Sequence, residues 1–271
     1  MNAERQANEA DLVLQRMREA EQTPTRPFVV PCKQLRWDAP LTWLRLGWRD
    51  LRQAPGLTLV FGGVIALASI AISLMAWSLG RFALLATLLS GFVFIAPLIG
   101  VGLYCVSREL EAGRRPALRH SFTLARRVVG QAAVFALAQL VVLLVWSRAG
   151  MMVSAFFPLQ TGELSELLEF LLLGSAIGSI FATLTFASAA LSLPMIADRE
   201  VDMITAVISS VNAVLRNKLP MAIWGALIAV LTAIGFATAF LGLVLIMPWL
   251  AYASWHAYRE TLDAADWPQM E

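Results

Sequence analysis

Long apolar stretches alternate with short polar ones along this chain, and their lengths predict the fold. Residues 56–79, 82–106, 128–147 and 167–194 are each long enough to cross a bilayer, and residues 219–258 contain no acidic or basic side chain apart from His256. About 20 apolar residues span the hydrocarbon core, so the last stretch, twice that length, predicts two crossings joined by a tight turn. Lipid offers backbone groups no hydrogen-bond partners, so each crossing must be a helix. The pattern predicts six transmembrane helices.

The distribution of basic residues supports the same count. Of the 21 Lys and Arg residues, all but Arg81 and Arg148 lie before residue 56, between residues 106 and 128, between residues 194 and 219, or after residue 258. Basic residues concentrate in cytoplasmic loops, so we predict a bacterial inner-membrane protein with both chain ends in the cytoplasm. Only 15% of the residues are charged, whereas soluble domains average about 25%.

An amphipathic segment precedes each predicted pair of crossings. The first carries the stripe Leu41, Leu44, Trp48 and Leu51, with Arg45, Arg49 and Arg52 at its edge. The second carries Leu118, Phe122, Ala125 and Val129, flanked by Arg115, Arg119 and Arg126. The third carries Ile204, Val207, Ile208, Val211 and Leu215, with Asp202, Thr205, Ser209, Asn212 and Arg216 opposite and Asp198 as its expected N-cap. Apolar stripes edged by Arg, and a Trp such as Trp48, suit helices lying in the membrane interface against anionic headgroups.

Together these patterns predict an all-α, polytopic membrane protein with six transmembrane helices arranged as three hairpins. An amphipathic, interfacial, cytoplasmic helix precedes each hairpin. Residues 1–40 are expected to form a partly flexible cytoplasmic tail, residues 41–260 the membrane domain, and residues 261–271 a cytoplasmic C-terminal tail. The second, fourth and sixth crossings end alike, in Ser107-Arg108-Glu109, Asp198-Arg199-Glu200 and Tyr258-Arg259-Glu260, which indicates a weak threefold repeat.

Four residues within the apolar stretches are candidates for packing or chemistry. Gln139 is the only amide side chain deep in a crossing, and we expect it to bond between helices, with substrate contact as the alternative. Gly174 and Gly178, spaced by four, predict close helix approach, either within the monomer or between copies. His256 is the single candidate for haem or metal ligation, and the alternative is a hydrogen bond at the interface.

Motifs that would indicate catalysis are absent from the sequence. It holds no phosphate-binding glycine loop, no HExxH, no GxSxG and no carboxylate relay within the crossings. We therefore predict no enzyme activity, no cofactor, no metal and no nucleic-acid partner. The first functional hypothesis is an accessory, scaffold or assembly component with a membrane-protein partner or a second copy of itself. The alternative is a transporter or channel for a small neutral or apolar solute, with Pro97, Pro194 and Pro248 as helix breaks beside a cleft.

Several stretches carry a resemblance to a known family. They are residues 193–202 (LPMIADREVD), 221–225 (MAIWG), 240–243 (FLGL), Pro248, 255–259 (WHAYR), 47–51 (GWRDL), Pro97 and 102–104 (GLY). Over residues 35–260 the chain resembles the bacterial integral-membrane family of domain of unknown function 2189. Some of its members are described as similar to subunit I of cytochrome c oxidase. That activity needs several histidines within the crossings, whereas this chain has two in all, so the resemblance implies at most an accessory role beside a respiratory complex.

Overall fold

The computed structural model describes residues 27–79, 99–156 and 164–270. Within these ranges the chain is helical and contains no β-sheet. The helices are α2 (Ala39–Gln53), α3 (Pro55–Leu79), α5 (Leu118–Phe156), α6 (Leu164–Ala189), α7 (Ser192–Asp198), α8 (Met203–Arg216), α9 (Lys218–Ala237) and α10 (Leu243–Thr261). Residues 99–111 are helical as well. The all-α class predicted from the sequence is therefore confirmed for the part of the chain that the structure describes.

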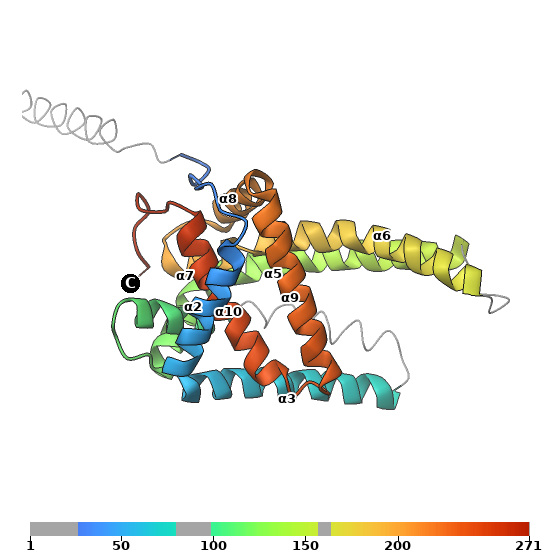
Figure 1. Cartoon of the computed structure of the whole chain (residues 1–271), viewed down its shortest axis with the longest axis horizontal. Coiled ribbons are helices and arrows are strands. Elements are labelled where there is room, and N and C mark those ends of the chain that lie inside the picture. Colours follow the sequence, from blue (N-terminus) through green and yellow to red (C-terminus); the bar gives the residue numbers. More distant parts are fainter. Residues whose placement is uncertain (1–26, 80–98, 157–163, 271) are drawn as a thin grey trace, which may run out of the picture.

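Helix α10 is the central element, and α2, α3 and α9 pack around it (Figure 1). The approach of α2 is close because Gly47 has no side chain: a Cβ there would lie 2.7 Å from the backbone nitrogen of Ala253. Three hydrogen bonds fix this crossing. Trp249 Nε1 donates to the Leu44 carbonyl at 2.8 Å, Trp43 Nε1 donates to Glu260 at 2.6 Å, and His256 Nε2 lies 2.8 Å from an oxygen of Asp50.

Helices α5 and α6 run side by side in opposite directions and form a long arm (Figure 1). The 39 residues of α5 correspond to about 58 Å at roughly 1.5 Å per residue, which exceeds the roughly 30 Å of a hydrocarbon core. Large apolar side chains of the arm point outward, among them Leu144 at 57% exposure and Leu172 at 71%. Extended apolar surface of this kind indicates contact with lipid.

Helix α8 is amphipathic in the opposite sense to a helix of a soluble protein. Its small polar residues face inward, where Ser209 accepts a hydrogen bond from the Val30 amide and Ser210 donates one to the Ala187 carbonyl. Its apolar residues Ile204 and Leu215 are exposed. This orientation fits the predicted apolar stripe that faces lipid.

Asp202, and not Asp198 as predicted, caps the N-terminus of α8. Its carboxylate accepts a hydrogen bond from the Thr205 amide at 2.9 Å, the usual N-cap geometry. Burial alone would raise the pKa of Asp202, but the hydrogen bonds from the backbone and hydroxyl of Thr205 outweigh it and lower the pKa. The prediction for Asp198 was wrong because that residue ends α7 and bonds elsewhere.

Four stretches of the described part are long and apolar enough to cross a membrane: Pro55–Met75, Leu118–Val153, Leu164–Asp198 and Lys218–Ala237. They coincide with four of the six predicted crossings. The second predicted crossing, residues 82–106, lies largely outside the described residues. The sixth falls in α10, whose C-terminal half is buried together with polar groups such as His256 and Tyr258 and is less apolar than a membrane span.

Two predicted amphipathic helices differ from expectation. The segment around residues 118–129 is not a separate helix but the first turns of α5, because nothing in the sequence interrupts it before the apolar run. Helix α2 does not lie free at an interface. It buries Trp43, Gly47 and Asp50 against α10, while Leu41 is half exposed.

Candidate functional site

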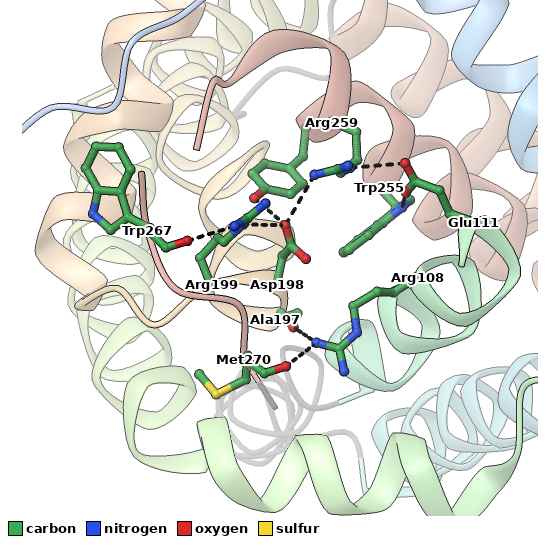
Figure 2. Close-up of polar contacts among 10 residues, drawn as sticks. Arg108, Glu111, Ala197, Asp198, Arg199, Trp255, Arg259, Trp267 and Met270 are labelled. Carbon is green, nitrogen blue, oxygen red and sulfur yellow. Dashed lines mark hydrogen bonds and ion pairs between the residues drawn. The ribbon is translucent and has the colours of Figure 1, made fainter. Parts of the chain in front are cut away.

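The three similar helix ends noted in the sequence meet at one place. Asp198, at the end of α7, is 4% exposed and receives three partners on a single carboxylate oxygen. Tyr258 donates its hydroxyl at 2.8 Å, Arg199 donates Nε at 3.0 Å, and Arg259 approaches at 3.5 Å. Figure 2 shows Arg199 and Arg259 converging on Asp198 from two segments. One carboxylate thus joins α7 to the end of α10.

Glu111 makes a second link beside the first. It accepts a hydrogen bond from Trp255 Nε1 at 2.9 Å and one from Arg259 Nε at 3.2 Å. Arg259 therefore bridges Glu111 and Asp198 (Figure 2). Because Glu111 belongs to the helix of residues 99–111, this pair of bonds ties that helix to α10.

The segment after α10 closes the same region through its backbone. Arg199 donates to the Trp267 carbonyl at 2.7 Å, and the Met270 amide donates to the Asp198 carbonyl at 2.8 Å. Arg108 donates to the carbonyls of Ala197 and Met270, at 3.1 and 2.8 Å (Figure 2). Residues 262–270 are therefore fixed against α7 and the helix of residues 99–111.

A cleft of about 820 Å³ opens beside this cluster, between the first turns of α5, the end of the helix of residues 99–111, α7 and α10. Three carboxylates line it, namely Glu109, Glu111 and Asp198. They are outnumbered by five guanidinium groups and one imidazole, from Arg108, Arg114, Arg119, Arg127, Arg259 and His120. We call this the arginine cleft.

Glu109 is neutralised within the cleft by Arg114. The two side chains form paired hydrogen bonds of 2.8 and 3.0 Å, and Glu109 is 6% exposed. The hydrogen bonds from Arg114 hold the pKa of Glu109 below its usual range, with a smaller contribution from the charge of the same group. Arg119 and Arg127, in contrast, are exposed and form no ion pair with a carboxylate among the described residues.

A buried histidine and a buried carboxylate form a pair between α2 and α10. His256 and Asp50 are 2.8 Å apart, and the side chains are 10% and 2% exposed. The structure thus gives His256 a carboxylate partner. Among the described residues, no group of three or more His, Cys, Asp or Glu side chains is placed to hold a metal ion.

The residues predicted to contact lipid or partners lie at several places. Arg45, Arg49 and Arg52 are on the exposed side of α2, and the guanidinium of Arg52 lies 5.4 Å from the ring centre of Trp48. Arg126 lies 6.0 Å from the ring centre of Phe122, and Arg115 is exposed before α5. Of this predicted set, only Arg119 lines the cleft.

The residues predicted to pack helices lie on the arm. Gln139 of α5 donates a hydrogen bond to Ser188 of α6 at 2.8 Å. A Cβ at Gly178 would lie 3.8 Å from Trp146 of α5, whereas nothing lies within 4 Å of a Cβ at Gly174. Close approach through Gly174 is thus not made within the described chain.

Sequence reasoning did not place Arg108, Glu111 and Asp198 in one site. The signal that pointed toward them was the shared Arg-Glu ending of three crossings, since Arg108, Arg199 and Arg259 all belong to the cluster. The partners of these residues lie as far as 162 positions away in the chain. No local pattern encodes such pairings.

Comparison with known proteins supports the membrane class. Residues 84–198 match a family described as predicted integral membrane protein (DUF2189). The match lies inside the region that carries the resemblance and includes α5, α6 and α7. Neither a curated protein nor a solved structure matches the chain. With its apolar helices, the chain is a multi-pass integral membrane protein.

Proposed function

We propose that this protein is a non-catalytic component of the bacterial inner membrane, acting as an accessory, scaffold or assembly subunit of a membrane complex. The observation that carries the proposal is the use of two buried carboxylates. Asp50 and Asp198 are 2% and 4% exposed, and each bonds a group on another helix. A general acid or base must instead reach a substrate proton, so these groups support a role in holding helices together.

The outer face of α6 supports contact with a partner helix. Ser179 and Thr183 are exposed, and their hydroxyls are satisfied by backbone carbonyls of the same helix, at 2.7 Å each. Such a face is narrow and presents no unpaired hydroxyl, and small residues permit close approach between helices in lipid. The large exposed neighbours Ile180 and Leu184 would then pack beside the crossing.

The test is gentle extraction of the full-length tagged protein, followed by mass spectrometry of the proteins that copurify. The variant Ser179→Leu/Thr183→Leu adds bulk to the narrow face, and Val141→Leu/Val145→Leu adds bulk to exposed positions of α5. We expect one reproducible membrane-protein partner, lost in the α6 variant and retained in the α5 variant. Retention of the partner by both variants, or no partner above the level of an unrelated membrane protein, contradicts the proposal.

Reconstitution separates this proposal from transport. A scaffold in liposomes leaves the permeability to small neutral solutes unchanged. Solute flux that requires the protein would replace the proposed function with the transport alternative. Reporter fusions at residue 1 and at residue 271 test the expected cytoplasmic location of both ends, because a periplasmic signal from either one contradicts the orientation.

A further inference from the structure

We propose that the arginine cleft binds a phosphate group, carried either by an anionic phospholipid or by a soluble ligand. This goes beyond the scaffold role, which needs no small-molecule site. The first argument is the charge that remains after internal pairing. Glu109 is bonded to Arg114, and Glu111 and Asp198 share Arg259. Those bonds leave other cations of the cleft without a carboxylate.

Three of the guanidinium groups carry this excess. Arg119 and Arg127 form no ion pair with any described residue, and Arg108 bonds only backbone carbonyls. The planar fork of Arg matches phosphate oxygens and can bind them in pairs. Three such groups around one cleft are suited to a doubly or singly charged phosphate.

An unsatisfied atom supports the same conclusion. Arg108 Nε is buried and has no hydrogen-bond partner. A buried donor without an acceptor is unfavourable, and native proteins satisfy nearly all of them. Arg108 lines the cleft, so this unsatisfied donor belongs to a side chain of the cleft itself.

The position of the cleft relative to the apolar helices fits a lipid headgroup. Arg127 immediately precedes Val128, where the apolar part of α5 begins. Arg119 lies eight residues earlier on the same helix, about 12 Å further out. The headgroup layer occupies roughly 5–8 Å on each side of the hydrocarbon core. The cleft therefore extends from the headgroup level into the aqueous phase, where both a lipid phosphate and a soluble phosphate can enter.

The experiment titrates purified full-length protein in a neutral detergent with three separate probes, using calorimetry. The probes are short-chain phosphatidylglycerol, short-chain phosphatidylcholine and inorganic phosphate. The test variant is Arg119→Gln/Arg127→Gln, which removes two exposed charges that bond no described side chain. The control is Lys33→Gln/Lys218→Gln, which also removes two exposed charges, both outside the cleft. Thermal unfolding of each protein confirms that both variants fold.

We expect the wild type to bind phosphatidylglycerol more tightly than phosphatidylcholine. The affinity for phosphatidylglycerol should be about tenfold lower in the cleft variant than in the wild type, and within about twofold of the wild type in the control. Binding of inorganic phosphate alone, with the same dependence on the variants, supports the site and identifies the ligand as soluble. Equal losses in the two variants would show general attraction to a basic surface and overturn the proposal. Failure of all three probes to bind the wild type overturns it as well.

Discussion

The contact between α2 and α10 depends on one glycine, and replacing it should be costly. In Gly47→Ala the new Cβ lies 2.7 Å from the Ala253 nitrogen and 3.0 Å from the Trp249 carbonyl oxygen. Ordinary van der Waals separations are about 3.5–4.0 Å. Both neighbours are backbone atoms of a helix and cannot rotate away. The two helices must therefore move apart by about 1 Å.

The magnitude follows from the contacts that this movement disturbs. Overpacking of a well-filled core costs about 1–3 kcal/mol. A separation of about 1 Å also stretches the bond between His256 and Asp50 from 2.8 Å beyond the usual limit, and a charge-assisted bond contributes about 1.5–3 kcal/mol. Alanine returns about 0.5–1 kcal/mol through its helix propensity. The net loss of unfolding free energy is about 3 kcal/mol, equivalent to a Tm lower by roughly 6–12 °C at this chain length.

The assay is thermal unfolding in a mild detergent, followed by tryptophan fluorescence. Gly63→Ala is the matched control, since nothing lies within 4 Å of a Cβ at that position of α3, and its Tm should equal or slightly exceed that of the wild type. A Gly47→Ala protein that unfolds within about 2 °C of the wild type would refute the close crossing.

Three further predictions rest on bonds described above. His256→Leu removes the hydrogen-bonded partner of buried Asp50, which then keeps only Arg49 at 3.8 Å, and should lower the unfolding free energy by about 3 kcal/mol. His256→Gln should recover part of the loss, and chemical denaturation measures both. The hydrogen bond between Gln139 and Ser188 should contribute only about 0.6 kcal/mol to the unfolding free energy, measured as the coupling energy of a double-mutant cycle that includes Gln139→Leu. The pKa of Glu109 is lower in the folded protein than in the unfolded chain. The stability that ionised Glu109 contributes is therefore present above the unfolded pKa of about 4.3 and is lost as the pH falls through the folded pKa. Arg114→Gln should flatten this part of a plot of Tm against pH.

The sequence predicted the long helices well, because the length of an apolar run is a direct physical requirement of the bilayer. The runs within α3, α5, α6 and α9 all appear as helices. The tight turn in the last run was also predicted from length, and the structure places it between Ala237 and Leu243. Ala239 and Phe240 adopt positive φ there, at 52° and 68°, a conformation that no residue preference would have indicated.

The buried face of α2 was not predictable from apolar periodicity. The stripe through Leu41 and Trp48 suggested a surface helix, but the face that packs on α10 runs through Trp43, Gly47 and Asp50. Lipid is as apolar as leucine, so the interior of a membrane protein is marked by small and polar residues rather than by the most apolar ones. The same reasoning explains why α8 turns its serines inward.

The arginine cleft was predicted only in part. The charge pattern identified Arg119 as a residue for anionic contact, yet it gave Arg115 and Arg126 the same role, and neither of these lines the cleft. Arg115 lies before α5 begins, and Arg126 lies on α5 but lines a different cavity. Distant segments form the other walls of the cleft. Met270, for example, reaches Arg108 from the far end of the chain.

The anchored segment that follows α10 has a consequence for biosynthesis. Residues 262–270 emerge from the ribosome after α10, yet their Trp267 and Met270 carbonyls accept the hydrogen bonds of Arg199 and Arg108. The ionic cluster therefore stays incomplete until the segment after α10 has been synthesised. A chain with a misplaced helix would leave this segment undocked and therefore accessible to the proteases that degrade misfolded membrane proteins.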